Sequence, residues 1–545
     1  MKKLGRRAKR TAVFSQHPGD RSLPAAEKRH AYDLCHLLKN CRRQRAPTEM
    51  VRLAPLPVRL CGRKAPWAFT GEALYGKWEA LRYMLVRKTG QKKPSPAENA
   101  ALGRILLPVV LELIFAFVIA NLNTLIISRF SANAVAATTA VGTFLSLMLN
   151  LYSVFYAGAG ILLAPYWGCQ QFSKGSNVWT VALVDNFLFS MLLGAVGFLG
   201  HSSICGFLKV PMELREMAGG YLMISLGLSA FQGFNLTCCT AFRAIGSMQV
   251  SMAGNTLISG SCVLLNFLVL TLVPAQKQTI YHFTWAGIVA QMLGSLFYLW
   301  MMRTDKRIEL RLFHGPWRQG YLQTTGKIFR LGFFGGMEGV LYLLCQTVVI
   351  SMIGRLGTRA LQISGYSANV MNYLTTPANA FAIATATVIG LALGAGDEEK
   401  TKRCLRKSLL LALSATVALE AAAMLFGRKI LRLYLSDGAM LDACMQLITV
   451  DLAVEIARCV AAIMVSSLKA IGDVRTPFLM VLLGGALNIS VSWLLGIHLG
   501  FGLPGVWAGY GADLALRGIV GLCVWNVRVA HHSYPILGQT LEKTV

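Results

Sequence analysis

The distribution of hydrophobic residues along the chain predicts an all-α protein that crosses a membrane many times. From about residue 103 to 528, apolar stretches of 20 residues or more recur between short polar segments. Such a stretch, as α-helix, crosses about 30 Å of hydrocarbon. The alternation of apolar and polar residues that membrane β-strands need does not occur in them. Twelve spans are expected, at 103–128, 134–166, 178–200, 217–241, 250–273, 282–302, 328–354, 363–393, 406–426, 443–467, 477–499 and 504–527.

Composition supports this prediction and adds a strongly basic N-terminus. The chain is 54% hydrophobic and 14% charged, against about 25% charged in a typical soluble protein. Residues 1–95 contain 23 Lys and Arg but only 6 Asp and Glu. A basic segment ahead of the first span is typical of a cytoplasmic extension, and a nucleic-acid-binding tail is the alternative. A start of translation at Met84 would leave most of this segment outside the protein. We expect no nucleic-acid partner.

The loops predict that both termini are cytoplasmic. With the N-terminus inside, the inner loops and their edges contain 16 Lys and Arg residues, and the outer loops contain 9. Cytoplasmic loops are the richer in Lys and Arg. We therefore expect a multi-pass protein of the cell (plasma or inner) membrane. Pro108, Pro165 and Pro377 lie in or at the ends of spans, where the missing N–H predicts bends or breaks.

The second half of the sequence repeats the first. With a shift of 226 residues, Glu112 falls on Glu338, Gly168 on Gly394, and the motif RAIG at 243–246 on KAIG at 469–472. After a four-residue gap, Asn266 falls on Asn488. Six spans in each half mean that both halves enter the membrane in the same direction, as parallel repeats. The expected regions are a basic extension, disordered or partly untranslated, at 1–97, an N-lobe at 98–302, a cytoplasmic linker at 303–327, a C-lobe at 328–530 and a tail at 531–545.

Several motifs occur within this repeat. They are LPVVLELIF at 107–115, SRFSANAVAA at 128–137, RAIGSMQV at 243–250, ALGAGDEEKTK at 392–402, KAIGDVRTP at 469–477 and LPGVWAGYGAD at 503–513. Together with the twelve spans, they resemble the multidrug and toxic compound extrusion (MATE) family over residues 98–530. The resemblance implies an antiporter that exports organic, often cationic compounds while H⁺ or Na⁺ moves inward.

The chain departs from the family pattern at acidic positions. Where the family often has Asp in the first helix, this chain has Asn123, and Leu270 stands where some members have Asp four residues after Asn266. The family's seventh-helix Glu matches Glu338, whereas the position of its tenth-helix Asp falls near Arg458. The resemblance therefore implies that ion coupling depends mainly on the second half of the chain.

Few residues within the spans can carry charge. A charge at mid-depth in a bilayer costs at least about 2.5–3.5 kcal/mol, so it needs a compensating role. Our hypothesis is that Glu338 is the main ion-coupling group, with Glu112 and Glu455 as secondary candidates. The alternative for Glu338 and Glu112 is that they cap backbone groups at bent helix starts. Glu455 can pair with Arg458 at i, i+3, either structurally or as a gate that opens on protonation.

Other polar residues have expected roles as well. Asp513 and Arg517 are expected to form a structural pair. Interhelical polar contacts are expected from Asp185, Glu420 and Asp451. Structural or gating roles are expected for Arg458, Asn266 and Asn488. Amides and phenols suit a cavity for flat, weakly basic compounds, and ordinary helix–helix hydrogen bonding is the alternative. The candidate cavity residues are Asn123, Asn150, Tyr366, Asn369, Asn372 and Asn379.

Two other functions compete with an antiporter. A lipid-linked oligosaccharide flippase of the same superfamily would line its cleft with Arg and Lys, which are few within the spans. A membrane-embedded enzyme would need a His/Asp or Cys/His set at one depth, and most His residues lie in the tail, the loops and the C-terminus. We expect a monomer without enzymatic activity that contacts membrane lipids and small organic substrates. Beyond the coupling ion, H⁺ or Na⁺, no cofactor or metal is expected.

Overall fold

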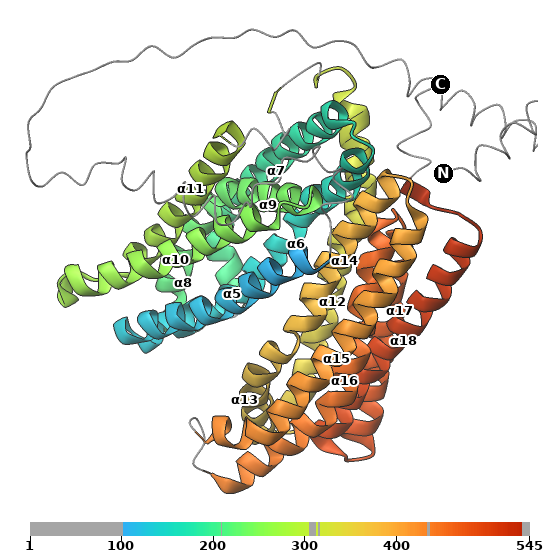
Figure 1. Cartoon of the computed structure of the whole chain (residues 1–545). Coiled ribbons are helices and arrows are strands. Elements are labelled where there is room, and N and C mark those ends of the chain that lie inside the picture. The colour runs from blue at the N-terminus through green and yellow to red at the C-terminus, as the bar shows by residue number, and fades with distance from the viewer. Residues whose placement is uncertain (1–101, 209, 305–311, 314–316, 433–436, 537–545) are drawn as a thin grey trace, which may run out of the picture. The chain divides into compact units, whose positions relative to one another are not determined.

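The computed structural model describes residues 102–536, except 209, 305–311, 314–316 and 433–436. They belong to one compact unit, Gln91–Val545. The basic extension predicted at 1–97 lies outside the described residues. Within the described part of the chain, the regular structure is entirely helical, so the predicted all-α membrane fold is confirmed (Figure 1).

The helices fall into two sets of six spans, which we call the N-half and the C-half. The N-half contains α5 (Leu102–Phe130), α6 (Ala132–Gly168), α7 (Phe172–Phe207), α8 (Met212–Gly227), α9 (Ser229–Ala244), α10 (Met248–Leu272) and α11 (Ile280–Thr304). The C-half contains α12 (Tyr321–Arg355), α13 (Thr358–Leu374), α14 (Thr376–Gly394), α15 (Glu398–Leu431), α16 (Gly438–Ala470), α17 (Arg475–Val491) with a π-helical continuation (Ser492–His498), and α18 (Gly502–Ala530).

Three spans are interrupted. The fourth span is divided into α8 and α9, which are bent by 54° relative to each other. The eighth span breaks at Thr375, two residues before Pro377, as a proline without an N–H would predict. The eleventh span ends in π-helix. Pro108 and Pro165, in contrast, lie inside continuous helices, so the breaks expected there do not occur.

Hydropathy alone recovers fewer spans than the fold contains. Among the described residues, nine helical segments are long and apolar enough to cross a membrane, or ten with the bent α8–α9 pair. The remaining two spans are α16 and α18, each of which contains an internal ion pair. The connection between the halves is shorter than the predicted linker 303–327, because α11 ends at Thr304 and α12 already begins at Tyr321.

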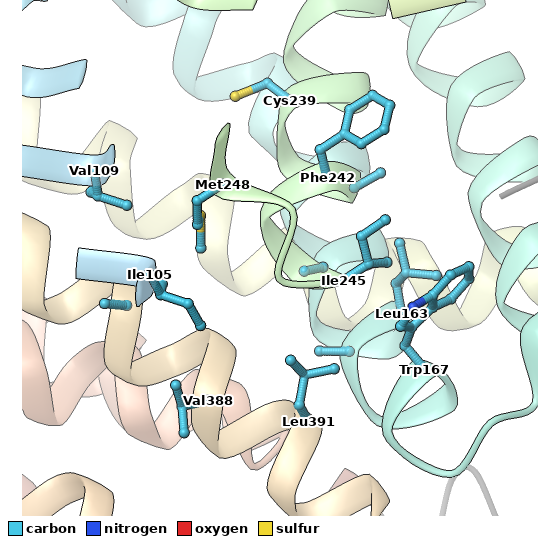
Figure 2. Close-up of a cluster of buried hydrophobic side chains, with 14 of the residues drawn as sticks. Ile105, Val109, Leu163, Trp167, Cys239, Phe242, Ile245, Met248, Val388 and Leu391 are labelled. Carbon is cyan, nitrogen blue, oxygen red and sulfur yellow. The ribbon is translucent and has the colours of Figure 1, made fainter. Parts of the chain in front are cut away.

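The two halves pack together near the end of the bundle at which the first span begins. In Figure 2, Val388 and Leu391 of α14 lie in one apolar cluster with Ile105 of α5 and with Leu163 and Trp167 of α6. Burying apolar side chains of this size contributes roughly 1.5–3 kcal/mol each. The cluster therefore holds α14 of the C-half against the first two helices of the N-half.

Glycines allow the backbones of the halves to touch at this end. A Cβ on Gly168 would lie 2.2 Å from Leu391 O, and a Cβ on Gly394 would lie 2.1 Å from Pro165 O. Since Gly168 and Gly394 are repeat-related, the two halves meet at equivalent positions. A Cβ on Gly332 of α12 would overlap Val154 O of α6. We call this contact between α6 and the helices α12 and α14 the glycine seam.

Candidate functional site

Glu112 lies in a buried polar network inside the N-half. Its side chain is 5% exposed and projects from α5 toward α9 and α10. Arg243, in the last turn of α9, forms an ion pair with Glu112 Oε1, and Asn255 Nδ2 of α10 donates to the same oxygen. Ser251 Oγ donates to Oε2 over 3.5 Å and accepts a hydrogen bond from Arg243 Nε over 3.0 Å. The carboxylate thus has its countercharge within the same half.

Glu338 pairs with a base at the position that is repeat-related to Arg243. Lys469 Nζ, in the last turn of α16, lies 2.7 Å from Glu338 Oε2 of α12, and the two side chains are 28% and 14% exposed. The shift of 226 that maps Glu112 on Glu338 also maps Arg243 on Lys469. In each half, an acid on the first span therefore binds a base in the last turn of the fourth span. The geometry favours ion pairing over the backbone-capping alternative.

A cavity of about 340 Å³ lies in the N-half beyond this pair. Its lining comes from α5, α6, α8, α9, α10 and α11, and none of the described residues that form it carries a charged side chain. The polar groups that line it are amides, phenols and hydroxyls, namely Asn123, Thr138, Tyr152, Tyr221, Ser225, Ser229, Gln232, Ser259, Asn266, Thr284 and Gln291. The volume is in the range of small-molecule sites.

Asn123 and Asn266 form the polar contact at the wall of this cavity. Asn266 Nδ2 donates to Asn123 Oδ1 over 2.6 Å. Asn266 is 2% exposed, and its Oδ1 has no hydrogen-bond partner among the described residues. Buried polar atoms are rarely left without a partner, so this oxygen still lacks a donor, and a small rotation of the side chain would let a molecule in the cavity supply one.

A second cavity, of about 330 Å³, connects the first one to Glu112. It is lined by Glu112, Arg243 and Asn255, and it shares Gln232 and Gln291 with the first cavity. Ala116 and Ile119 line both cavities. One stripe of α5, from Glu112 through Ala116 and Ile119 to Asn123, therefore faces this hollow interior.

The other predicted cavity residues lie elsewhere. Asn150 of α6 packs over Gly339 of α12, where a Cβ would overlap its Oδ1. Tyr366 packs against the apolar core of the C-half. Asn372 and Asn379 are exposed, and the side chain of Asn369 lies outside the described ones. Of the candidate cavity residues whose side chains the structure describes, only Asn123 therefore lines the first cavity.

Sequence reasoning missed several lining residues. Gln232 and Gln291 face both cavities, and Gln291 also holds Asn235, which donates to Gln291 Oε1 over 2.7 Å. Gln291 lies on α11 and Gln232 on α9, and neither of these helices contains an acidic residue. The only sequence signal was that an uncharged amide in an apolar span needs a polar neighbour.

The acids of the C-half differ in how they are partnered. Arg458 Nε donates to Glu455 Oε1 over 2.6 Å, and Arg517 Nε donates to Asp513 Oδ1 over 2.6 Å, as the i, i+3 and i, i+4 spacings predicted. Asp451 Oδ1 accepts from Trp507 Nε1 of α18 over 3.2 Å. Neither of the buried oxygens of Glu420 has a hydrogen-bond partner among the described residues, so no hydrogen bond from Glu420 joins two helices.

Two further predicted residues have structural contacts. Asp185 of α7 accepts hydrogen bonds from Tyr321 and Thr325 of α12, the second over 2.8 Å, so it joins the two halves. Asn488 of α17 is buried and accepts a hydrogen bond from Ser492 Oγ over 3.0 Å. Asn488 therefore differs in environment from its repeat mate Asn266, which lines the first cavity.

Comparisons with known proteins agree with this geometry. "Uncharacterized transporter YisQ" of Bacillus subtilis is 25% identical over 460 residues, which cover 82% of this chain and 98% of YisQ. "Probable multidrug resistance protein NorM" of Thermotoga maritima is 21% identical over 81% of this chain and 95% of its own length. A solved structure described as "Outward-facing conformation of a multidrug resistance MATE family transporter of the MOP superfamily" superposes with a TM-score of 0.73 at 15% identity, and the match covers 82% of this chain and 99% of that one.

The MatE family profile matches the chain twice, at residues 108–271 and 336–494. One match lies in each half, as the internal repeat predicts. Together the two matches cover more than half of the chain. With the twelve-span fold beside them, they establish that the chain belongs to the MatE family of membrane transporters, which have no enzymatic activity.

Proposed function

We propose that this transporter is a secondary antiporter, which exports organic cations in exchange for H⁺ or Na⁺ by alternating access. The observation that supports it most directly is the uncharged, amide-lined cavity in the N-half. An organic molecule of modest size fits about 340 Å³, and the enclosing side chains are apolar or neutral, as in most small-molecule sites.

The preference for cations rests on Asn266 and two tyrosines. The unpartnered Oδ1 of Asn266 requires a hydrogen-bond donor, which a protonated amine supplies and a carboxylate does not. Tyr152 and Tyr221 line the same cavity, and the faces of aromatic rings attract organic cations. An anionic substrate would find no cationic side chain in this lining.

A lipid-linked oligosaccharide flippase fits the lining less well. Binding a pyrophosphate takes Arg or Lys groups that are free to contact its oxygens. In the adjoining cavity, Arg243 is the one cationic side chain, and it is held by Glu112.

Coupling is proposed to involve Glu338, Glu112 and Glu455. Each of these carboxylates contacts a cation of its own half, namely Lys469, Arg243 or Arg458. Entry of H⁺ or Na⁺ at such a carboxylate would weaken its ion pair, and the freed base could then change partners. The glycine seam closes the end of the bundle at which the first span begins, and the cavity lies farther from that end. This arrangement is compatible with a cavity that opens alternately to the two sides of the membrane.

Purified protein in proteoliposomes tests this proposal. A fluorescent organic cation is enclosed, and a proton gradient and a sodium gradient are imposed separately. We expect one of the gradients to drive the dye across the membrane against its own gradient. Asn266→Ala should raise the half-saturating dye concentration about 10- to 150-fold, since a hydrogen bond to a charged donor is worth about 1.5–3 kcal/mol. The control Gln323→Ala alters an exposed position on α12. Dye that binds but never moves under either gradient would contradict antiport.

A further inference from the structure

Three carboxyl groups meet between α15 and α16 in the interior of the C-half. Glu420 comes from α15, and Asp451 and Glu455 come from α16, where the spacing of four residues puts both on one face. Gly427 of α15 lies against Met445 and Ile448 of α16, and two turns earlier on the same face of the antiparallel α15, Glu420 comes opposite Asp451 and Glu455. Glu420 and Glu455 are 0% exposed and Asp451 is 1% exposed.

Most oxygens of this cluster have no hydrogen-bond partner. Both oxygens of Glu420, Oδ2 of Asp451 and Oε2 of Glu455 are buried without one among the described residues. Arg458 and Trp507 satisfy one oxygen each, on Glu455 and Asp451 respectively. Because unpartnered buried polar atoms are rare in folded proteins, four of them at one place indicate a bound species that supplies the missing contacts.

The surrounding helices supply too little positive charge. Arg458 is the only cation that interacts directly with the cluster among the described residues. α14 contributes no titratable side chain, and Asp513 and Arg517 of α18 neutralise each other. The remaining titratable groups near Arg458 or the cluster are uncharged phenols and a thiol, on Tyr342, Tyr510, Tyr366 and Cys459. Three ionised carboxylates and one guanidinium would leave a net charge of −2 among buried side chains.

Protons fit this site better than a metal ion does. An uncompensated buried charge costs several kcal/mol, and two protons on the three carboxyls would remove the excess. In the described part of the chain, no three His, Cys, Asp or Glu residues are grouped closely enough to hold a metal ion together.

We infer that Glu420, Asp451 and Glu455 form an enclosed proton-binding site that carries two protons in the conformation described here. The inference deepens the proposed antiport, on which its transport role rests, by identifying the coupling ion as H⁺ and its carrier as the α15–α16 cluster. Glu112 and Glu338 differ from this cluster, because each already has a full countercharge. When the C-half rearranges and water reaches the cluster, each O–H bond that breaks transfers its proton to water and leaves a carboxylate.

Infrared spectroscopy of the full-length protein in lipid nanodiscs tests the protonation without any transport. The C=O stretch of a protonated carboxylic acid is resolved from that of a carboxylate. We expect the band of buried acids at neutral pH to fall by about half in Glu420→Gln, because the two remaining carboxyls and Arg458 then need about one proton for neutrality. In Glu420→Gln/Asp451→Asn the band should vanish, because Arg458 alone balances Glu455. The control is Asp442→Asn, an exposed position on α16 that pairs with Arg428. An unchanged band in Glu420→Gln would overturn the inference, as would a wild-type band that Na⁺ removes at constant pH.

Transport by the same variants separates this inference from the proposed function. We expect Glu420→Gln to reduce dye movement driven by a proton gradient at least tenfold, while exchange of dye for dye without a gradient stays within about twofold of wild type. A wild-type protein that moves no dye under any gradient, but loses the infrared band in the variants, would refute antiport and keep the site. Full proton-driven transport in Glu420→Gln would refute the coupling role.

Discussion

Gly394 offers a direct test of the glycine seam. In Gly394→Ala, the added Cβ would lie 2.1 Å from Pro165 O and 2.7 Å from Pro165 Cα. Favourable contacts between such atoms lie near 3.5 Å, and the atoms it meets are backbone atoms, which cannot rotate away as a side chain can. Relief therefore requires α14 and α6 to separate by about 1 Å.

The energetic effect follows from this overlap. Overpacking by one methyl group in a well-packed contact costs about 1–3 kcal/mol. A conformation in which this end of the bundle opens does not contain the contact and does not bear that cost. The substitution should therefore shift the equilibrium between closed and open seam about 5- to 150-fold toward the open form.

Distance measurements between spin labels across the seam report this shift. Labels at Gln170 and Glu399 lie at exposed positions next to the ends of α6 and α14, and they are best carried by non-natural residues because the chain has 13 Cys. We expect the long-distance population to grow in Gly394→Ala. The control is Gly335→Ala on α12, where a Cβ meets nothing within 4 Å. If Gly394→Ala and Gly335→Ala give the wild-type distribution, the seam does not control closure.

Four further substitutions test the polar contacts. Glu338→Gln removes the carboxylate that Lys469 contacts, and we expect gradient-driven efflux to be lost in proteoliposomes while the protein still inserts into the membrane. Arg243→Gln leaves Glu112 buried without its cation, so thermal unfolding should show that the free energy of unfolding falls by about 3–5 kcal/mol. For Lys469→Gln, whose ion pair is more exposed, we expect a fall of about 1–2 kcal/mol. Equal losses in the two variants would contradict this ranking. Tyr321→Phe removes a hydrogen bond to a carboxylate of α7, worth about 1.5–3 kcal/mol. We expect the spin labels to show a more open seam in this variant. An unchanged distance distribution would exclude this bond as a determinant of closure.

The fold and the paired acids could be predicted because they follow local rules. Span positions depend on stretches of some 20 apolar residues, which any helix across a bilayer needs. The repeat then linked Glu112 to Glu338 and RAIG to KAIG before any contact was known. Only the structure shows that these two matches belong together, because the acid and its base lie on the first and fourth spans of each half.

The cavity could be predicted only in part. The stripe on α5 that carries Asn123 was visible, since residues three to four apart share a helix face. Gln232 and Gln291 lie on other spans, and whether their faces turn toward α5 depends on the 54° bend between α8 and α9 and on the packing of α11. The candidates on the eighth span followed the same helical spacing, but most of them are exposed or pack against the C-half core.

Glu420 shows why a charge within a span is not informative by itself. In the sequence, it resembles Glu338 or Asp513, each an acid in an apolar helix. The structure separates the three by their partners, because Glu338 meets Lys469 and Asp513 meets Arg517, whereas Glu420 meets only other acids. A carboxylate with a full countercharge takes up a proton only when its ion pair opens, as we propose for Glu338 and Glu112 during coupling. An acid among acids needs a proton to stay buried, so we expect Glu420 to hold one even while the C-half is closed.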